Sequence, residues 1–238
     1  MRIHFFILVI FLIQITLKFI LEDFGYVNTV LSQIFVVFIP VCVYLIASEK
    51  RVGRYFEIEN RKVITDVIIT VLTVVSVNIL SLYLNYPIIK IMKLENPILQ
   101  KDNSIYELVI GIFVLCLVPA IFEELLFRGI LLEEFIKKHS LIKASILSSL
   151  LFAMIHFDII NIFPQFIIGL LLCYIALSSK SVLLPIIAHF SNNLFSLLFG
   201  NDMMEYFFQN GIPVFILALV VCTGGVVYFK SKTSRREI

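Results

Sequence analysis

Charge is the scarcest property of this sequence. Of its 238 residues only 15% are charged, whereas 60% are hydrophobic, and the mean hydropathy is +1.02. Soluble domains carry about 25% charged residues, and a soluble protein this apolar would expose large adhesive patches. The shortage of charge excludes an ordinary soluble protein and predicts one helical membrane domain with no separate soluble domain.

Three further absences narrow the class of protein. No Cys-x-x-Cys or zinc spacing is present, so the cysteines are interpreted as apolar packing residues. They are Cys42, Cys116, Cys173 and Cys222. No basic cluster resembles a nucleic-acid surface, and no nucleic-acid partner is expected at a net charge of +2. Residues 15–21 contain no Ala, Gly or Ser for signal cleavage, so the first apolar run is expected to be an uncleaved span.

Long apolar runs dominate what the sequence does contain. A helix that crosses a membrane needs about 20 mostly apolar residues. Eight runs approach that length, which predicts an all-α, polytopic membrane helix bundle with about eight transmembrane helices. The runs are residues 4–21, 27–47, 64–84, 105–130, 143–157, 162–179, 182–199 and 212–229.

Lysine and arginine are distributed unevenly between the connections. The loops after spans two, four and six and the C-terminal tail are basic, through Lys50, Arg51, Arg54, Arg61, Lys62, Lys137, Lys138, Lys143, Lys180, Lys230, Lys232, Arg235 and Arg236. The loops after spans one, five and seven contain acids and no Lys or Arg, and the acids are Glu22, Asp23, Asp158, Asp202 and Glu205. The positive-inside rule then predicts that both termini are cytoplasmic. The loop after span three, with Lys90, Lys93 and Lys101, does not fit this pattern.

Two of the 17 acids lie well inside an apolar run, and both belong to Glu-Glu-Leu-Leu-Phe-Arg, residues 123–128. Each carboxylate costs about 3 kcal/mol at mid-membrane, so such residues indicate function. Glu124 and Arg128 are one helical turn apart and can pair. Glu123 points about 100° away from that face, so it is not part of this pair. A buried carboxylate outside the pair is favoured as a general acid/base. The alternative is that both acids lock helices together. Pro119 is expected to free a backbone carbonyl just before them.

Two histidines also lie inside spans. His156 ends Phe-Ala-Met-Ile-His, which begins at Phe152, and His189 is followed one turn later by Asn193. Each motif alone is compatible with a structural role. Three helices that bring an acid, an imidazole and an amide into the membrane are explained most simply by one shared cavity, which we predict.

The depths of these residues give a check on that cavity. From the cytoplasmic ends of their predicted spans, His189 lies about 11 Å deep and His156 about 20 Å. Glu123 matches the shallower level if its helix ends near residue 130. A tilted fifth helix, or a fourth helix that continues towards Lys137, would bring Glu123 and His156 closer to one level.

The ordered motifs Glu-Glu-x-x-x-Arg, Phe-x-x-x-His and His-x-x-x-Asn on successive helices resemble the CPBP family. This family groups type II CAAX prenyl endopeptidases with bacteriocin-processing and Abi-type proteins. The resemblance divides the chain into N-terminal transmembrane helices (1–100), a CPBP-type catalytic core (105–200), and the last transmembrane helix with a basic tail (201–238).

The resemblance implies an intramembrane protease in a bacterial cell membrane, in contact with lipid, with a site that opens to the cytoplasm. Its substrate would be a peptide or lipidated peptide. Glu123 would activate a water, Glu124 and Arg128 would hold the helix and tune that acid, and Phe152 would give structural support. The remaining residues would orient the water or stabilise the oxyanion, and they are His156, His189 and Asn193.

The resemblance leaves the metal question open. Zinc bound by Glu123, His156 and His189 is one option. A metal-free mechanism driven by Glu123 fits the same residues, and no His-Glu-x-x-His motif is present. Two other functions also remain open. One is a catalytically silent immunity or scaffold protein, and the other is an ion-coupled transporter, against which the absence of an internal repeat argues.

Overall fold

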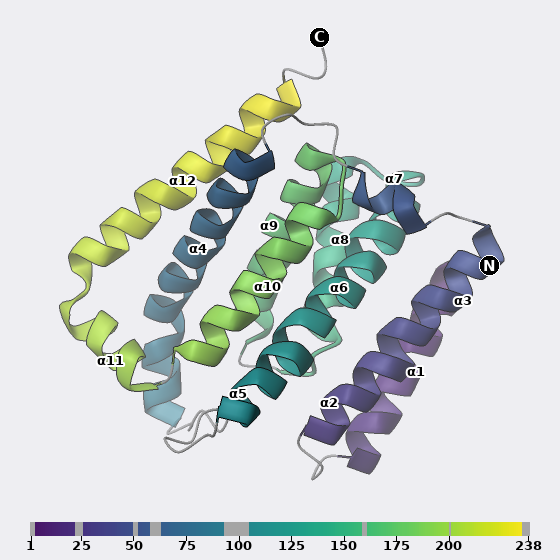
Figure 1. Ribbon diagram of the computed structural model, residues 1–238, viewed down its shortest axis with the longest axis horizontal. Coiled ribbons are helices and arrows are strands. Elements are labelled where there is room, and N and C mark those ends of the chain that lie inside the picture. Colours follow the sequence, from purple (N-terminus) through teal and green to yellow (C-terminus); the bar gives the residue numbers. More distant parts are fainter. Residues whose placement is uncertain are drawn as a thin grey trace. The chain divides into compact units, whose positions relative to one another are not determined.

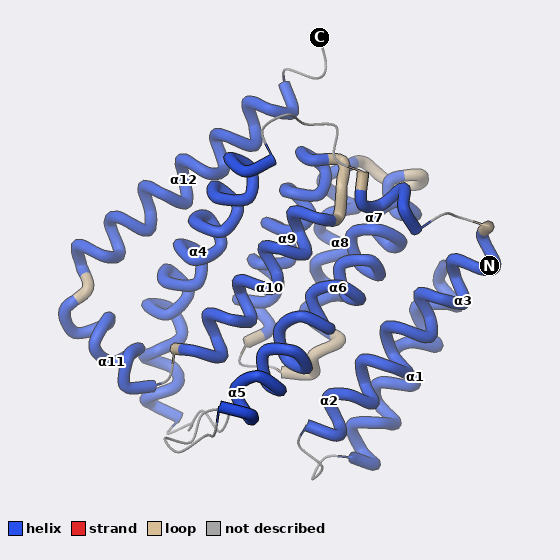
Figure 2. Tube along the Cα trace, in the orientation of Figure 1, coloured by secondary structure: helices blue, strands red, loops and turns tan. Residues whose placement is uncertain are grey.

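A computed structural model describes residues 3–21, 26–49, 52–57, 63–92, 105–158, 161–199 and 201–234. Helices form all the regular structure in this part of the chain. Those residues contain no strand (Figures 1 and 2). The prediction of an all-α membrane bundle is confirmed. Several residues used above to predict the topology lie outside the described residues: Glu22, Asp23, Lys50, Arg51, Arg61, Lys62, Lys93, Lys101, Arg235 and Arg236. The side chains of Arg54 and Asp202 are likewise not described.

Within the described residues, six helices are long and apolar enough to cross a membrane by length and composition: Ile3–Ile20, Thr29–Ser48, Val63–Tyr83, Ile105–Ile136, Ile162–Ser179 and Ile212–Lys232. The other two predicted spans are the shorter apolar helices Leu141–Met154 and Leu183–Leu198. At 1.5 Å per residue these two are about 21 and 24 Å long, less than a hydrocarbon core of about 30 Å. The chain is therefore a multi-pass integral membrane protein.

The chain forms two compact units, residues 1–59 with 117–186 and residues 60–116 with 187–238. The first unit contains α1 (Ile3–Leu21), α2 (Tyr26–Ser32), η1 (Gln33–Phe38), α3 (Ile39–Ser48), η2 (Val52–Phe56), α6 (Val118–Glu124), η4 (Leu125–Leu131), α7 (Leu132–Ile136), α8 (Leu141–Met154) and α9 (Ile162–Ser179). The second contains α4 (Val63–Met92), α5 (Ile105–Gly111), most of η3 (Ile112–Leu117) and of α10 (Leu183–Leu198), α11 (Asn201–Asn210) and α12 (Ile212–Ser234). The division of the sequence at residues 100 and 200 stays a prediction.

One end of the first unit joins α1 to the end of α8. The side-chain amide of Gln14 donates to the carbonyl of Ile155 at 3.2 Å, and the ammonium of Lys18 donates to the carbonyl of Phe157 at 3.0 Å. Both residues lie in the second half of α1, which runs beside α2 and η1 (Figure 1). The last turns of α1 and α8 and the first turn of α2 therefore meet at this end.

The opposite end of the first unit is organised by Tyr55 in η2. Its carbonyl accepts a hydrogen bond from the N–H of Val182 at 2.8 Å, and its hydroxyl donates to Glu133 at 3.2 Å. Tyr44 of α3 donates to the neighbouring Glu134 at 2.7 Å. The connection after α3, helix α7 and the α9–α10 turn thus meet at this end.

Helices α8 and α9 approach closely at Gly169. A Cβ atom on Gly169 would lie 2.9 Å from Cβ of Ser149, closer than real side chains approach, so only glycine allows this contact. Small residues permit such close helix packing in membranes. The contact also leaves the backbone of α9 near Arg128 of η4, as described below.

Helices α4 and α12 form the main contact of the second unit. Buried Asp66 on α4 accepts a hydrogen bond from the hydroxyl of Tyr228 at 2.7 Å and forms an ion pair with Lys232, both on α12. Further along the same contact, Gly225 lies against Thr73: a Cβ atom there would meet Oγ1 of Thr73 at 1.9 Å. Pairing satisfies the buried carboxylate, and the missing side chain lets the helices touch.

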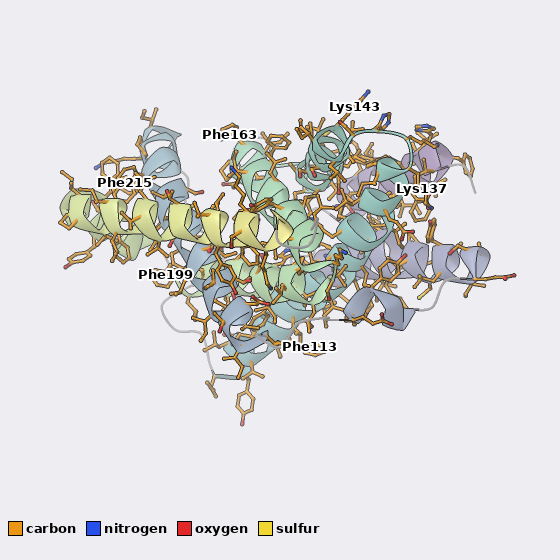
Figure 3. The ribbon with its side chains drawn as sticks, turned by 90° about the horizontal axis from the view of Figure 1, so that it is seen from above. Phe113, Lys137, Lys143, Phe163, Phe199 and Phe215 are labelled. Carbon is orange, nitrogen blue, oxygen red and sulfur yellow. The ribbon has the colours of Figure 1, made fainter. Side chains whose placement is uncertain are left out.

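Large apolar side chains remain on the outside of the helices. Phe113 and Phe163 are 57% and 59% exposed and point away from the ribbon in Figure 3. Lipid can cover such side chains without the penalty that water would impose. The exposed apolar surface is therefore the expected counterpart of the low charge content.

We expect Gly225→Ala to destabilise the second unit, because the new methyl group overlaps Thr73. Overpacking of this kind costs about 1–3 kcal/mol. The neighbouring Gly224→Ala is the matched control, since its Cβ would meet no atom within 4 Å. Melting temperatures in detergent should fall for Gly225→Ala and not for Gly224→Ala, and equal values would contradict the packing argument.

Candidate functional site

A fully buried ion pair forms the base of the candidate site. Nη1 of Arg128 lies 2.7 Å from Oε1 of Glu124, and neither side chain is exposed. Nη2 of Arg128 donates to the carbonyl of Gly169 at 3.1 Å. The predicted pairing one helical turn apart is present. Because buried charges are costly to desolvate, this pair depends on additional partners such as Gly169.

The backbone around Arg128 is π-helical. In η4 the N–H of Leu132 bonds to the carbonyl of Phe127, five residues earlier. The hydroxyl of Ser148 on α8 donates to the same carbonyl at 3.0 Å. π-helical turns occur frequently at functional sites, and this one is fixed to α8 by Ser148.

Phe152 connects the ion pair to the first histidine. Its ring centre lies 4.4 Å from the guanidinium carbon of Arg128 and 5.1 Å from the ring centre of His156. A cation over an aromatic face is stabilised by the ring quadrupole. The structural support predicted for Phe152 therefore takes the form of a stack between the arginine and the histidine.

The backbone of Phe152 also sets the tautomer of His156. Nδ1 of His156 lies 2.8 Å from the carbonyl oxygen of Phe152. A carbonyl can only accept a hydrogen bond, so Nδ1 carries the hydrogen, and Nε2 of the neutral ring is an acceptor.

Glu123 and His156 are brought together. Oε2 of Glu123 lies 3.9 Å from Nε2 of His156. The helix that contains Glu123 continues to Ile136, which puts this acid about 20 Å from the helix end, as deep as His156. The longer fourth helix considered above accounts for the match in depth.

Glu123 has a partner that the sequence analysis missed. The side-chain amide of Gln33 in η1 donates to Oε1 of Glu123 at 2.6 Å. The sequence places Glu123 away from the face of Glu124 and Arg128, and this neutral partner comes from the N-terminal helices. Polar residues inside the apolar run 27–47 were the available signal.

A cavity of about 350 Å³ opens beside Glu123 and His156 within the first unit. Much of its polar wall comes from α1, α2 and η1, through Gln14, Lys18, Thr29, Ser32 and Gln33. Gln14 and Lys18 are four residues apart and share a helix face. The first part of the chain therefore contributes directly to the candidate site.

Each of the two glutamines presents an acceptor that has no hydrogen-bond partner among the described residues. Nε2 of Gln14 and Nε2 of Gln33 each donate to a group that can only accept, which fixes both amide orientations. The Oε1 atoms of both are buried without a hydrogen-bond partner among the described residues. An unsatisfied buried acceptor costs about 1–3 kcal/mol. A ligand that brings N–H or O–H donors would remove that cost.

His189 and Asn193 belong to the second unit. His189 is buried in α10, and Nδ2 of Asn193 donates to the carbonyl of Leu115 at 3.1 Å. Pro119 has no N–H to offer that carbonyl four residues earlier, so the expected freed carbonyl is used by Asn193. That His189 and Asn193 share one cavity with Glu123 stays a prediction.

No group of three or more His, Cys, Asp and Glu side chains in the described part of the chain is placed to hold a metal ion. Glu123 and His156 supply two donors, and a histidine held through Nδ1 by a carbonyl is typical of metal ligands. A catalytic zinc ion takes three protein ligands. These two residues alone therefore do not form such a site, and His189 would have to supply the third ligand.

Comparison with known proteins places the motifs in a family. Residues 105–195 match the model of a family described as type II CAAX prenyl endopeptidase Rce1-like. An uncharacterized 24.3 kDa protein of Escherichia coli is 28% identical over 104 residues, which are 42% of this chain and 48% of that protein, so the match spans about half of that relative. No solved structure matches the chain. The matched residues 105–195 include all three motifs, and over this stretch the chain is similar to the type II CAAX prenyl endopeptidases, which supports the CPBP resemblance.

Proposed function

We propose that this protein is an intramembrane endopeptidase that cleaves membrane-associated or lipidated peptides with a water activated by Glu123. The 3.9 Å approach of Glu123 to His156 at a polar cavity is the observation that carries the proposal. A single water about 2.8 Å from both atoms could donate one hydrogen to each, because both are acceptors.

The chemistry needs one proton carrier. Glu123 takes a proton from the water as its oxygen attacks the carbonyl carbon of the scissile bond. When the C–N bond breaks, Glu123 returns that proton to the leaving nitrogen. Nε2 of His156 accepts the second hydrogen of the water and so orients the lone pair of the water oxygen. Gln33 fixes the carboxylate of Glu123.

The oxyanion needs donors on the other side of the scissile carbonyl. We assign this role to His189 and Asn193, whose motif follows that of His156 along the chain. The amide of Asn193 uses one hydrogen on Leu115 and keeps a second for an oxyanion. Donors fixed before the reaction stabilise the charge that develops in the transition state.

We expect Glu123→Gln to lower cleavage of a membrane peptide reporter by at least about 100-fold, the usual contribution of a general base. Its melting temperature in detergent should stay close to that of the wild type, because the shape of the side chain is kept. Glu107→Gln is the matched control, since it removes an exposed acid on α5. Cleavage by Glu123→Gln at the wild-type rate would favour the scaffold or transporter alternatives.

Arg128→Met should lose stability as well as activity. It leaves Glu124 charged and buried, and breaking a buried pair costs about 3–5 kcal/mol. The double variant Glu124→Gln/Arg128→Met should recover much of the melting temperature, because no uncompensated charge remains. A stable, active Arg128→Met would show that the pair does not support the site.

Gln33→Met should lower kcat about 10-fold or more with little change in melting temperature. Methionine keeps the length of the side chain and removes the donor that holds Glu123, and losing such a supporting contact typically costs 10–100-fold. Ile34→Met, on the same segment with its side chain exposed, is the control. An unchanged kcat in Gln33→Met would remove Gln33 from the mechanism.

A further inference from the structure

The backbone directly after His156 adopts an uncommon conformation. Phe157 has a φ of 51°, in the left-handed region that disfavours residues with a Cβ atom. Two other described residues with positive φ, Glu49 and Lys180, directly follow α3 and α9, where such a residue commonly ends a helix. Phe157 lies three residues beyond the end of α8. Backbone strain of this kind persists where surrounding contacts hold it, and it gathers at functional sites.

Helix α1 supplies contacts that hold Phe157. Nζ of Lys18 donates to the carbonyl of Phe157 at 3.0 Å and lies 5.6 Å from the centre of its ring. The ring of Phe11 meets the same ring edge to face, with the two centres 6.4 Å apart. A cation over an aromatic face and an edge-to-face aromatic pair are both attractive. Phe157 is therefore held through its backbone and through its side chain.

The same helix also holds the residue before His156. The side-chain amide of Gln14 donates to the carbonyl of Ile155 at 3.2 Å. Phe11, Gln14 and Lys18 are three and four residues apart, so they lie on one face of α1. We call these three residues the α1 clamp. The carbonyls on both sides of His156 are thus fixed by side chains of one helix.

These contacts bear on His156 because it lies beyond the last residue of α8, Met154. Its ring is oriented by the bond between Nδ1 and the carbonyl of Phe152 at 2.8 Å. Its Nε2 faces Oε2 of Glu123 across 3.9 Å. A displacement of about 1 Å in a reacting group can lower a rate about 100-fold. The backbone on which the ring is mounted therefore has to be held as well as the ring.

We propose that Phe11, Gln14 and Lys18 are positioning residues, which hold His156 in the orientation that water activation beside Glu123 requires. The catalytic meaning of this inference rests on the proposed function. All three residues lie outside the stretch 105–195 that matches the family model. Helix α1 thus acts through His156 and does not itself take part in the proton transfer.

A double-variant cycle separates positioning from a general loss of stability. Lys18→Met removes the donor to Phe157 and should lower kcat for the reporter about 10-fold or more. Lys18→Arg keeps a cationic donor and should restore most of kcat. In a His156→Gln background, followed in long single-turnover reactions, Lys18→Met should cause no further loss, because the ring that it positions is gone.

Lys138→Met, which removes an exposed lysine, is the matched control for the cycle and should keep the wild-type kcat. A general loss of stability would instead lower kcat by the same factor in both backgrounds. That result, or an unchanged kcat in Lys18→Met, overturns the proposal.

Phe157→Gly tests the clamp at a residue that the described wall of the cavity does not include. Glycine adopts a positive φ without strain, so relief of the strain offsets part of the lost ring contacts and the melting temperature should fall little. Loss of the ring held by Phe11 and Lys18 frees the turn, and kcat should fall about 10-fold or more. A wild-type kcat in Phe157→Gly overturns the proposal.

A signal from His156 itself separates this inference from the proposed function. NMR of protein with labelled histidine nitrogens, assigned through His156→Gln, should show the Nδ1–H tautomer in the wild type. The double variant Gln14→Met/Lys18→Met should show a mixture of tautomers. That change without any cleavage that depends on Glu123 overturns the protease function and leaves the clamp standing. An unchanged tautomer beside cleavage that depends on Glu123 overturns the clamp and leaves the protease function standing.

Discussion

The ion pair between Glu124 and Arg128 is the contact on which the candidate site depends. Both side chains are excluded from solvent, and two separate charges at that depth would be too costly to keep. The two charges neutralise each other across one helical turn, from the end of α6 into η4. The same helix can therefore carry a second acid, Glu123, on a neighbouring face. The guanidinium also donates to the carbonyl of Gly169 and lies over the ring of Phe152.

The same contacts transmit this arrangement to the reacting groups. Gly169 must be glycine for α9 to reach α8 at Ser149, and that approach brings its carbonyl to Arg128. Phe152 packs on the guanidinium while its own carbonyl selects the hydrogen on Nδ1 of His156. A change in the ion pair is therefore expected to alter the orientation of the His156 ring, because the side chain of Phe152 contacts both Arg128 and His156.

The N-terminal helices form much of the polar wall of the cavity. They hold Glu123 through Gln33 and line the cavity with polar side chains. The stretch that matches the family model and much of the polar wall of the cavity thus lie in different parts of this chain.

Membrane insertion, the helical class and the pairing of Glu124 with Arg128 were determined by sequence alone, because apolar length and one helical turn are local properties. The sequence could also indicate that Glu123 and His156 meet, since unpaired polar groups in lipid need a common cavity. The contacts made by Gln33 and Gly169 were decided only by the tertiary structure. Each depends on which helices lie side by side, and contacts between residues far apart in the chain leave no mark in its local pattern.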